Sequence, residues 1–109
     1  MLLTRLLEQH DYFVLTASSV RQADKVLAQE AIDAVVLDVR MPTQSGLVLL
    51  EAIRRQERWR NMPVLISTGV VLTQEEQDLV ARHRAYVFYK PTSYDTLIVY
   101  LDKLTRSNL

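Results

Sequence analysis

Short apolar runs alternate along this chain with longer segments that have the period of a helix. Apolar residues recur at helical spacing over residues 2–9, 20–30, 47–58 and a last segment that Ser93 can cap. The capping-box pattern Thr-Gln-Glu-Glu at 73–76 predicts a further helix through about residue 82. The runs between these segments are rich in strand-forming residues and cover residues 12–16, 34–37, 64–66 and 87–89. Strands joined by helices form right-handed crossovers and lie parallel, with helices on both faces of the sheet. The sequence therefore predicts a doubly wound α/β sandwich with four strands and five helices.

Composition narrows the class of protein. With 109 residues, the chain has room for one domain and no second one, so we expect a single domain over residues 1–109 without an output domain. Thirteen basic residues balance thirteen acidic ones, which argues against direct nucleic-acid binding by the whole domain. The absence of cysteine excludes disulfides and thiolate metal sites. No apolar run is long enough for a membrane span and no secretory signal is present, so we expect a cytoplasmic protein without membrane contact.

Three polar residues follow three of the predicted strands. They are Asp38, Thr68 within Ser67-Thr68-Gly69, and Lys90 before Pro91. Ligands of open α/β sheets gather beyond the carboxyl ends of the strands, so these side chains are expected to converge. An aspartate there can act as a nucleophile toward a phosphoryl group, and an amine and a hydroxyl can bind the oxygens of that group. Each residue alone also has a plain structural interpretation, as a helix cap, a strand-end hydroxyl or a solvated lysine.

The motifs around these residues resemble the receiver (response regulatory) domain of two-component signalling. The match consists of Asp-Val-Arg-Met-Pro-Thr-Gln-Ser-Gly at 38–46, Pro-Val-Leu-Ile-Ser-Thr-Gly at 63–69 and Phe-Tyr-Lys-Pro-Thr-Ser at 88–93. All three motifs occur in the family's order, and the resemblance covers about residues 2–105. It implies a flavodoxin-like fold and a phosphorelay switch rather than an enzyme, with at most self-catalysed phosphotransfer and dephosphorylation.

The resemblance implies a role for each matched position. Asp38 would be the phosphoacceptor, Thr68 would contact the phosphoryl oxygen in the active state, and Lys90 would form a salt bridge with the phosphoryl group. The donor would be a sensor histidine kinase or a phosphotransfer protein. A homodimer is also compatible with the family, and the basic cluster at 82–84 is either part of such a contact or a solvated surface.

The resemblance also implies a metal site and three structural residues. Mg²⁺ would bind Asp38 and the backbone carbonyl of Arg40. Gly46 would permit a backbone turn that is costly for residues with a β-carbon. Pro42 and Pro91 would shape the loops after their strands, and the bond before Pro91 is often cis in the family.

Two departures from the family pattern qualify these expectations. The chain begins at Met1 inside the segment that aligns with the family's first helix, so the first strand and its metal-binding acidic pair are missing. We therefore expect a truncated receiver that binds Mg²⁺ weakly or not at all, in which 12–16 pairs beside 34–37 or another chain supplies the strand. The aromatic residue that usually lies three positions before the lysine is replaced by Val87, between Tyr86 and Tyr89.

These departures leave an alternative function open. A pseudo-receiver would act as a protein-protein docking module without phosphorylation, and the missing acidic pair favours it. The intact Asp38, Thr68 and Lys90 favour phosphorylation instead. A phosphatase of the haloacid dehalogenase type also uses a strand-end aspartate, but it requires a second aspartate at position 40, which is Arg40 here.

Overall fold

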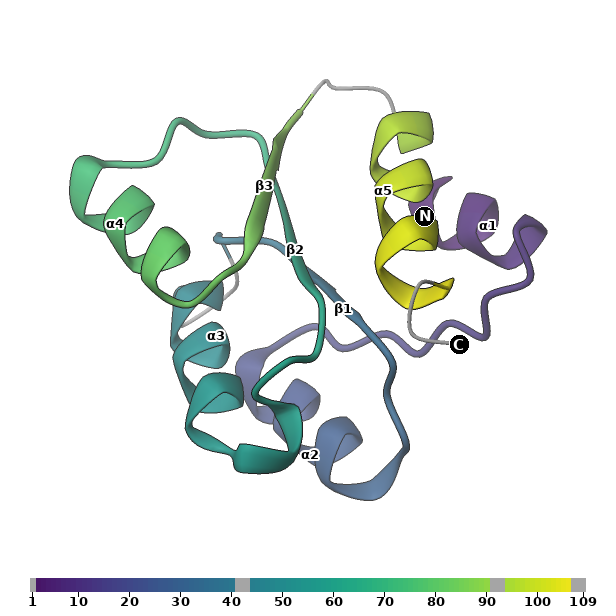
Figure 1. Ribbon diagram of the computed structural model, residues 1–109, viewed down its shortest axis with the longest axis horizontal. Helices are drawn as coiled ribbons and strands as arrows, with labels where there is room; N and C mark the ends of the chain where they lie inside the picture. The colour runs from purple at the N-terminus through teal and green to yellow at the C-terminus, as the bar shows by residue number, and fades with distance from the viewer. Residues whose placement is uncertain (1, 41–43, 91–93, 107–109) are drawn as a thin grey trace.

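A three-stranded parallel sheet lies between two groups of helices in the computed structural model (Figure 1). The structure describes residues 2–40, 44–90 and 94–106. The strands are β1 (Val35–Leu37), β2 (Val64–Thr68) and β3 (Tyr86–Tyr89). The helices are α1 (Leu2–Gln9), α2 (Val20–Gln29), α3 (Gly46–Arg55), the short 3₁₀ helix η1 (Glu57–Trp59), α4 (Gln74–Arg82) and α5 (Tyr94–Arg106). The doubly wound α/β class and the number of α-helices are confirmed.

The strands lie side by side in chain order, with β2 at the centre. Val35 pairs with Val64 and Leu65 with Tyr86, both in parallel register. Every residue of β2 is buried, as expected for a strand that is covered on both faces. The continuous apolar run at 64–66 therefore predicted a buried strand correctly, and this strand is the central one of the three.

Alternate residues of β2 face two different hydrophobic cores. Leu65 packs with buried side chains of α1 and α5, including Leu7 and Leu97. Val64 and Ile66 pack on the other face, in a larger core built mainly from α2, α3 and α4. Figure 1 shows the same division, with α1 and α5 together on one side of the sheet. The period of two along β2 thus places one helix layer on each face.

Short polar residues fix where several helices begin. The Ser19 hydroxyl accepts a hydrogen bond at the start of α2 and the Ser45 hydroxyl accepts one at the start of α3. Thr73 and Glu76 form the capping box that the sequence predicted at the start of α4. The predicted helix at 47–58 is interrupted, because α3 ends at Arg55 and η1 follows it. The predicted cap Ser93 lies outside the described residues.

The prediction of a strand at 12–16 is wrong. These residues contain no strand and pair with neither β1 nor any other part of the chain that the structure describes, so the sheet there has three strands, not four. The expected pairing beside 34–37 is also absent, because β1 is hydrogen-bonded to β2 alone. A strand requires a ladder partner, and high β-propensity alone does not provide one.

The segment at 12–16 is nevertheless held against the protein. Tyr12 and Val14 pack against the core of α1 and α5, whereas the Phe13 side chain between them is 90% exposed. The Tyr12 hydroxyl donates a hydrogen bond to Asp102 on α5. Side-chain contacts, rather than backbone pairing, therefore hold this segment in place.

None of the helices within the described ranges has the length and apolar character needed to cross a membrane.

Candidate functional site

An aspartate and a lysine from distant parts of the chain meet at the carboxyl edge of the sheet. Asp38 directly follows β1, and Lys90 directly follows β3. The Lys90 Nζ lies 3.2 Å from Asp38 Oδ2, although 52 positions separate the two residues in the sequence. The two side chains are 42% and 40% exposed, respectively. The predicted convergence of these two residues is therefore present.

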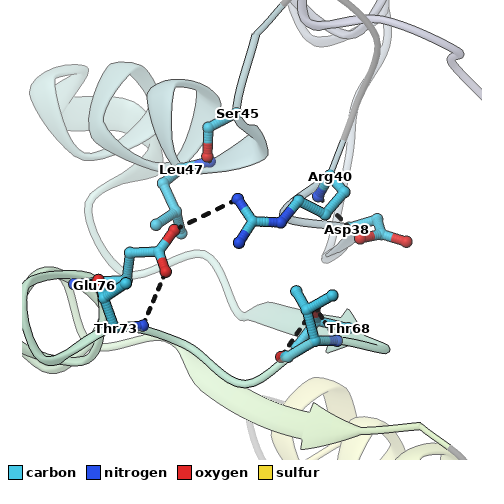
Figure 2. Close-up of polar contacts among 8 residues, drawn as sticks. Asp38, Arg40, Ser45, Leu47, Thr68, Thr73 and Glu76 are labelled. Carbon is cyan, nitrogen blue, oxygen red and sulfur yellow. Dashed lines mark hydrogen bonds and ion pairs between the residues drawn. The ribbon is translucent and has the colours of Figure 1, made fainter.

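The second carboxylate oxygen of Asp38 is held by its own loop. The Arg40 backbone N–H donates a hydrogen bond of 3.0 Å to Asp38 Oδ1, as Figure 2 shows. This bond closes a local turn that is typical of aspartate and fixes the direction of the carboxylate. Oδ2 faces the Lys90 amine, and the partial exposure of this pair leaves the oxygen open to a reaction partner from solvent.

Thr68 ends the central strand at the same edge. It is fully buried, and its backbone carbonyl accepts a hydrogen bond of 2.7 Å from the Lys90 N–H. Its hydroxyl oxygen accepts a hydrogen bond of 3.3 Å from the Val70 N–H and lies 3.5 Å from the Val70 carbonyl oxygen. The structure therefore brings Thr68 to the predicted edge, with the hydroxyl bonded to Val70 rather than to Asp38.

Gly46 lets the start of α3 approach the backbone of Asp38. A β-carbon at this position would collide with the Asp38 carbonyl oxygen and lie 3.0 Å from Leu37 Cδ1. The Gly46 N–H also donates a hydrogen bond of 2.8 Å to the Val39 carbonyl. The predicted cost of a β-carbon at this glycine is present in the structure, and its cause is steric, because no glycine among the described residues has a positive φ. Close packing against Asp38, not backbone conformation, requires glycine here.

An ion pair that the sequence did not predict connects the Asp38 loop to α4. The Arg40 Nη1 lies 3.7 Å from Glu76 Oε2 (Figure 2). The other oxygen of Glu76 accepts a hydrogen bond of 2.8 Å from the Thr73 N–H, within the capping box. The capping box was visible in the sequence, but the partner of Glu76 comes from a loop more than thirty residues earlier, so local sequence offered no signal for it.

The predicted metal site has few protein ligands. Mg²⁺ prefers six oxygen ligands in an octahedral arrangement, several of them waters. The resemblance assigns it Asp38 and the Arg40 carbonyl, and no group of three or more acidic or histidine side chains lies together within the described residues. One carboxylate, already bonded to Lys90 and to the Arg40 N–H, is a poor match to the six oxygens that Mg²⁺ prefers. The predicted structural residues Pro42 and Pro91 lie outside the described ranges.

Comparison with known proteins identifies the family. The family model of the response regulator receiver domain matches residues 1–102. The transcriptional regulatory protein AlgB of alginate biosynthesis in Pseudomonas syringae pv. tomato is 34% identical over 91 residues, which is 84% of this chain and 20% of AlgB. The CAI-1 autoinducer sensor kinase/phosphatase CqsS of Vibrio cholerae is 35% identical over 65 residues, which is 59% of this chain and 10% of CqsS. The chain thus spans a fifth or less of the length of these relatives.

Solved structures show the same fold. The receiver domain of the Francisella response regulator 1452 superimposes with a TM-score of 0.84 at 22% identity, covering 99% of this chain and 88% of that one. The family model, the curated relatives and the fold agree with the motifs around Asp38, Thr68 and Lys90. The chain belongs to the response regulator receiver domain family of two-component systems.

Proposed function

We propose that this chain accepts a phosphoryl group on Asp38 from a phosphohistidine of a sensor kinase or phosphotransfer protein. The contact of 3.2 Å between the Lys90 amine and Asp38 Oδ2 is the observation that carries the proposal. It pairs a strand-end carboxylate with a cation that can bind the oxygens of an incoming phosphoryl group. The occurrence of related sequence in a sensor kinase supports a partner of this kind.

The chemical step forms one bond and breaks one. An oxygen of the Asp38 carboxylate attacks phosphorus, and the bond between phosphorus and the histidine nitrogen breaks. The electron pair of that bond returns to the imidazole, which leaves as the neutral ring once its other nitrogen carries a proton from solvent. Asp38 becomes an acyl phosphate. The Lys90 ammonium moves from the carboxylate to the phosphoryl oxygens and offsets their charge.

Thr68 can respond to that product. Its hydroxyl is held by the backbone of Val70 in this structure, at contacts of 3.3 and 3.5 Å. Both distances are at the long end for hydrogen bonds that involve a hydroxyl, so exchanging them for a bond to a phosphoryl oxygen costs little. Such an exchange would move Val70 and the loop that leads to α4. This is the switch that we propose for the cytoplasmic signalling role of the chain.

Phosphorylation can be measured directly by intact mass after incubation with acetyl phosphate, with and without Mg²⁺. We expect the mass to increase by one phosphoryl group in the wild type and in Asp33→Asn, a matched control in the exposed loop before β1. Asp38→Asn should abolish the increase. Lys90→Met should reduce its rate while leaving the fold intact.

Absence of any mass increase at high Mg²⁺ concentration would contradict the proposal. The chain would then act as a pseudo-receiver that docks to other proteins without phosphorylation, which the small set of metal ligands favours. Equal phosphorylation of Asp38→Asn and the wild type would place the acceptor at a different residue and would also reject the assignment.

A further inference from the structure

Arginine is concentrated in two short segments of this neutral chain. Six of its ten arginines fall within residues 54–60 and 82–84, where Glu57 is the one acidic residue. They are Arg54, Arg55, Arg58, Arg60, Arg82 and Arg84. The first segment contains η1, and the second forms the turn between α4 and β3. Both therefore lie at the amino edge of the sheet, opposite Asp38. The receiver chemistry does not account for this concentration of positive charge.

Three of these arginines line one pocket. Arg54, Arg60 and Arg84 surround it together with the apolar Met62 and Pro63 and the ring of Tyr86. None of the described residues that line it is acidic. Its volume of about 270 Å³ is close to the lower end of the range for small-molecule sites, so a small ligand fits it better than a peptide.

Arg54 is fixed in this pocket by backbone carbonyls rather than by acids. Its Nε donates a hydrogen bond of 2.7 Å to the His83 carbonyl, and its Nη1 donates to the carbonyls of Trp59 and Met62 at 2.9 and 2.8 Å. No carboxylate of the described residues forms an ion pair with this guanidinium, so backbone carbonyls alone hold its positive charge there.

Arg84 occupies a backbone position that normally favours glycine. Its φ of 56° is left-handed, and it directly follows the cap residue of α4. A non-glycine residue there raises the free energy of the folded state. The side chain of Arg84 lines the pocket and donates a hydrogen bond of 2.9 Å to the Arg60 carbonyl. The chain thus keeps a cation at a position where glycine would be more stable.

The charges around this pocket repel one another. Burial lowers the pKa of Arg54, and the charge of Arg84 lowers it further. Burial also lowers the pKa of the nearby His83. The charges of Arg82, Arg54 and Arg84 lower it further, and only Glu51 opposes them. Within the part of the chain that the structure describes, the one carboxylate that pairs with a lining arginine is Glu57, whose side chain is 91% exposed and lies 3.7 Å from Arg60. An exposed pair of this kind neutralises little charge.

We propose that this pocket binds the phosphate groups of a small anionic ligand. Guanidinium groups donate hydrogen bonds in a planar pair that matches phosphate oxygens, and the fold brings together three arginines from two separate segments, 54–60 and 82–84. The ligand would occupy the amino edge of the sheet, remote from Asp38. It can be a free polyphosphate or the diphosphate of a nucleotide, because both present the same group to the arginines.

Calorimetric titration of the full chain with pyrophosphate tests the proposal, with sodium chloride at matched ionic strength in the reference titration. We expect saturable binding that Arg84→Gly weakens about tenfold, the loss expected from one charge-assisted contact. Glycine suits the left-handed backbone at position 84, so this variant keeps the fold. Arg60→Gln, at a half-exposed side chain, should weaken binding similarly. Arg82→Gln, an exposed neighbour that does not line the pocket, should bind as the wild type does.

The same titration with ADP separates the two sources of phosphate. Binding tighter than that of pyrophosphate supports a nucleotide, and equal or weaker binding supports a free polyphosphate. Lack of saturable heat with both ligands would overturn the proposal. So would an equal loss of affinity in Arg82→Gln and Arg84→Gly, because the anion would then respond to overall charge rather than to the pocket. Asp38→Asn should leave binding unchanged, which keeps this test independent of phosphorylation.

Discussion

The two edges of the sheet use charge in different ways. At the carboxyl edge, opposite charges face each other in partly exposed pairs, Asp38 with Lys90 and Arg40 with Glu76. At the amino edge, the positive charge of Arg54 is held by three backbone carbonyls. Exposed ion pairs contribute little to stability and can exchange partners, whereas a cation that satisfies carbonyls contributes to the fold itself. We therefore call the carboxyl edge the changeable edge of the sheet and the amino edge the fixed edge.

The largest effect that we expect concerns the fixed edge. Arg54→Met keeps most of the length of the side chain but removes its hydrogen bonds to the carbonyls of His83, Trp59 and Met62. Those carbonyls join η1, the start of β2 and the turn before β3. We expect the free energy of unfolding to fall by about 2–4 kcal/mol, as urea denaturation would measure.

Arg55→Met is the matched control for that variant. Arg55 is the next residue on α3, its side chain is exposed, and its loss should change stability by less than about 0.5 kcal/mol. Similar losses in the two variants would mean that Arg54 stabilises the helix through general charge effects. The contrast between the edges would then disappear.

The next effect concerns the backbone beneath the changeable edge. Gly46→Ala would place a methyl group against the Asp38 carbonyl and force α3 and the Asp38 loop apart. We expect a destabilisation of about 1–3 kcal/mol, the usual cost of overpacking, together with slower phosphorylation of Asp38. Denaturation and the phosphorylation assay would measure the two effects.

Gly69→Ala provides the comparison, because it lies at the same edge with room for a β-carbon. The nearest atom to that carbon would be Lys90 Cδ at 4.0 Å, an ordinary contact. Its stability should therefore stay within about 0.5 kcal/mol of the wild type. A larger loss in Gly69→Ala than in Gly46→Ala would reject the steric explanation of Gly46.

The elements that sequence predicted well are those whose signals are local. Continuous apolar runs identified β1, β2 and β3, and the helical spacing of apolar residues at 2–9 identified α1. The capping box of Thr73 and Glu76 was readable for the same reason. Strand ends then placed Asp38 and Lys90 at one edge, since parallel topology converts chain order into spatial proximity.

The failures have a different origin. Residues 12–16 have the composition of a strand, but whether they form one depends on a ladder partner elsewhere in the fold. The ion pair of Arg40 with Glu76 and the hydrogen bonds of Arg54 likewise join residues that no local pattern connects. A sequence motif does not show which hydrogen-bond partner a hydroxyl group takes. The hydrogen bond between Thr68 and Val70 was therefore also not predictable. Tertiary partners, not propensities, decide these features.

A further prediction concerns the contact between Tyr12 and α5. This helix also contributes Leu104 to the pocket at the fixed edge. The Tyr12 hydroxyl bonds Asp102 and lies 3.3 Å from the Thr105 hydroxyl. Tyr12→Phe should lower the free energy of unfolding by about 1 kcal/mol at neutral pH and loosen the segment that contains Phe13. Denaturation and proteolysis of that segment would report the two changes.

The same contact predicts a dependence on alkaline pH. Burial raises the pKa of Tyr12 above its ordinary value of 10.0, and the hydrogen bond to Asp102 adds to the increase. The folded state therefore keeps the phenolic proton that the unfolded state loses. The stabilising contribution is complete below pH 10 and declines as pH rises from 10 through the raised pKa. Melting temperatures of the wild type should fall more steeply in this range than those of Tyr12→Phe, and parallel curves would contradict the assignment.

The smallest effect belongs to the changeable edge, and a double-mutant cycle can measure it. Arg40→Gln and Glu76→Gln remove the ion pair, and glutamine can preserve the capping box at the start of α4. We expect a coupling free energy of about 0.2–1 kcal/mol, because the Arg40 side chain is 56% exposed. Molar concentrations of salt should reduce this coupling. A coupling as large as the effect of Arg54→Met would show that Arg40 is locked onto α4. Both edges would then be fixed, and the loop that carries Asp38 would lack the freedom that we assign to it.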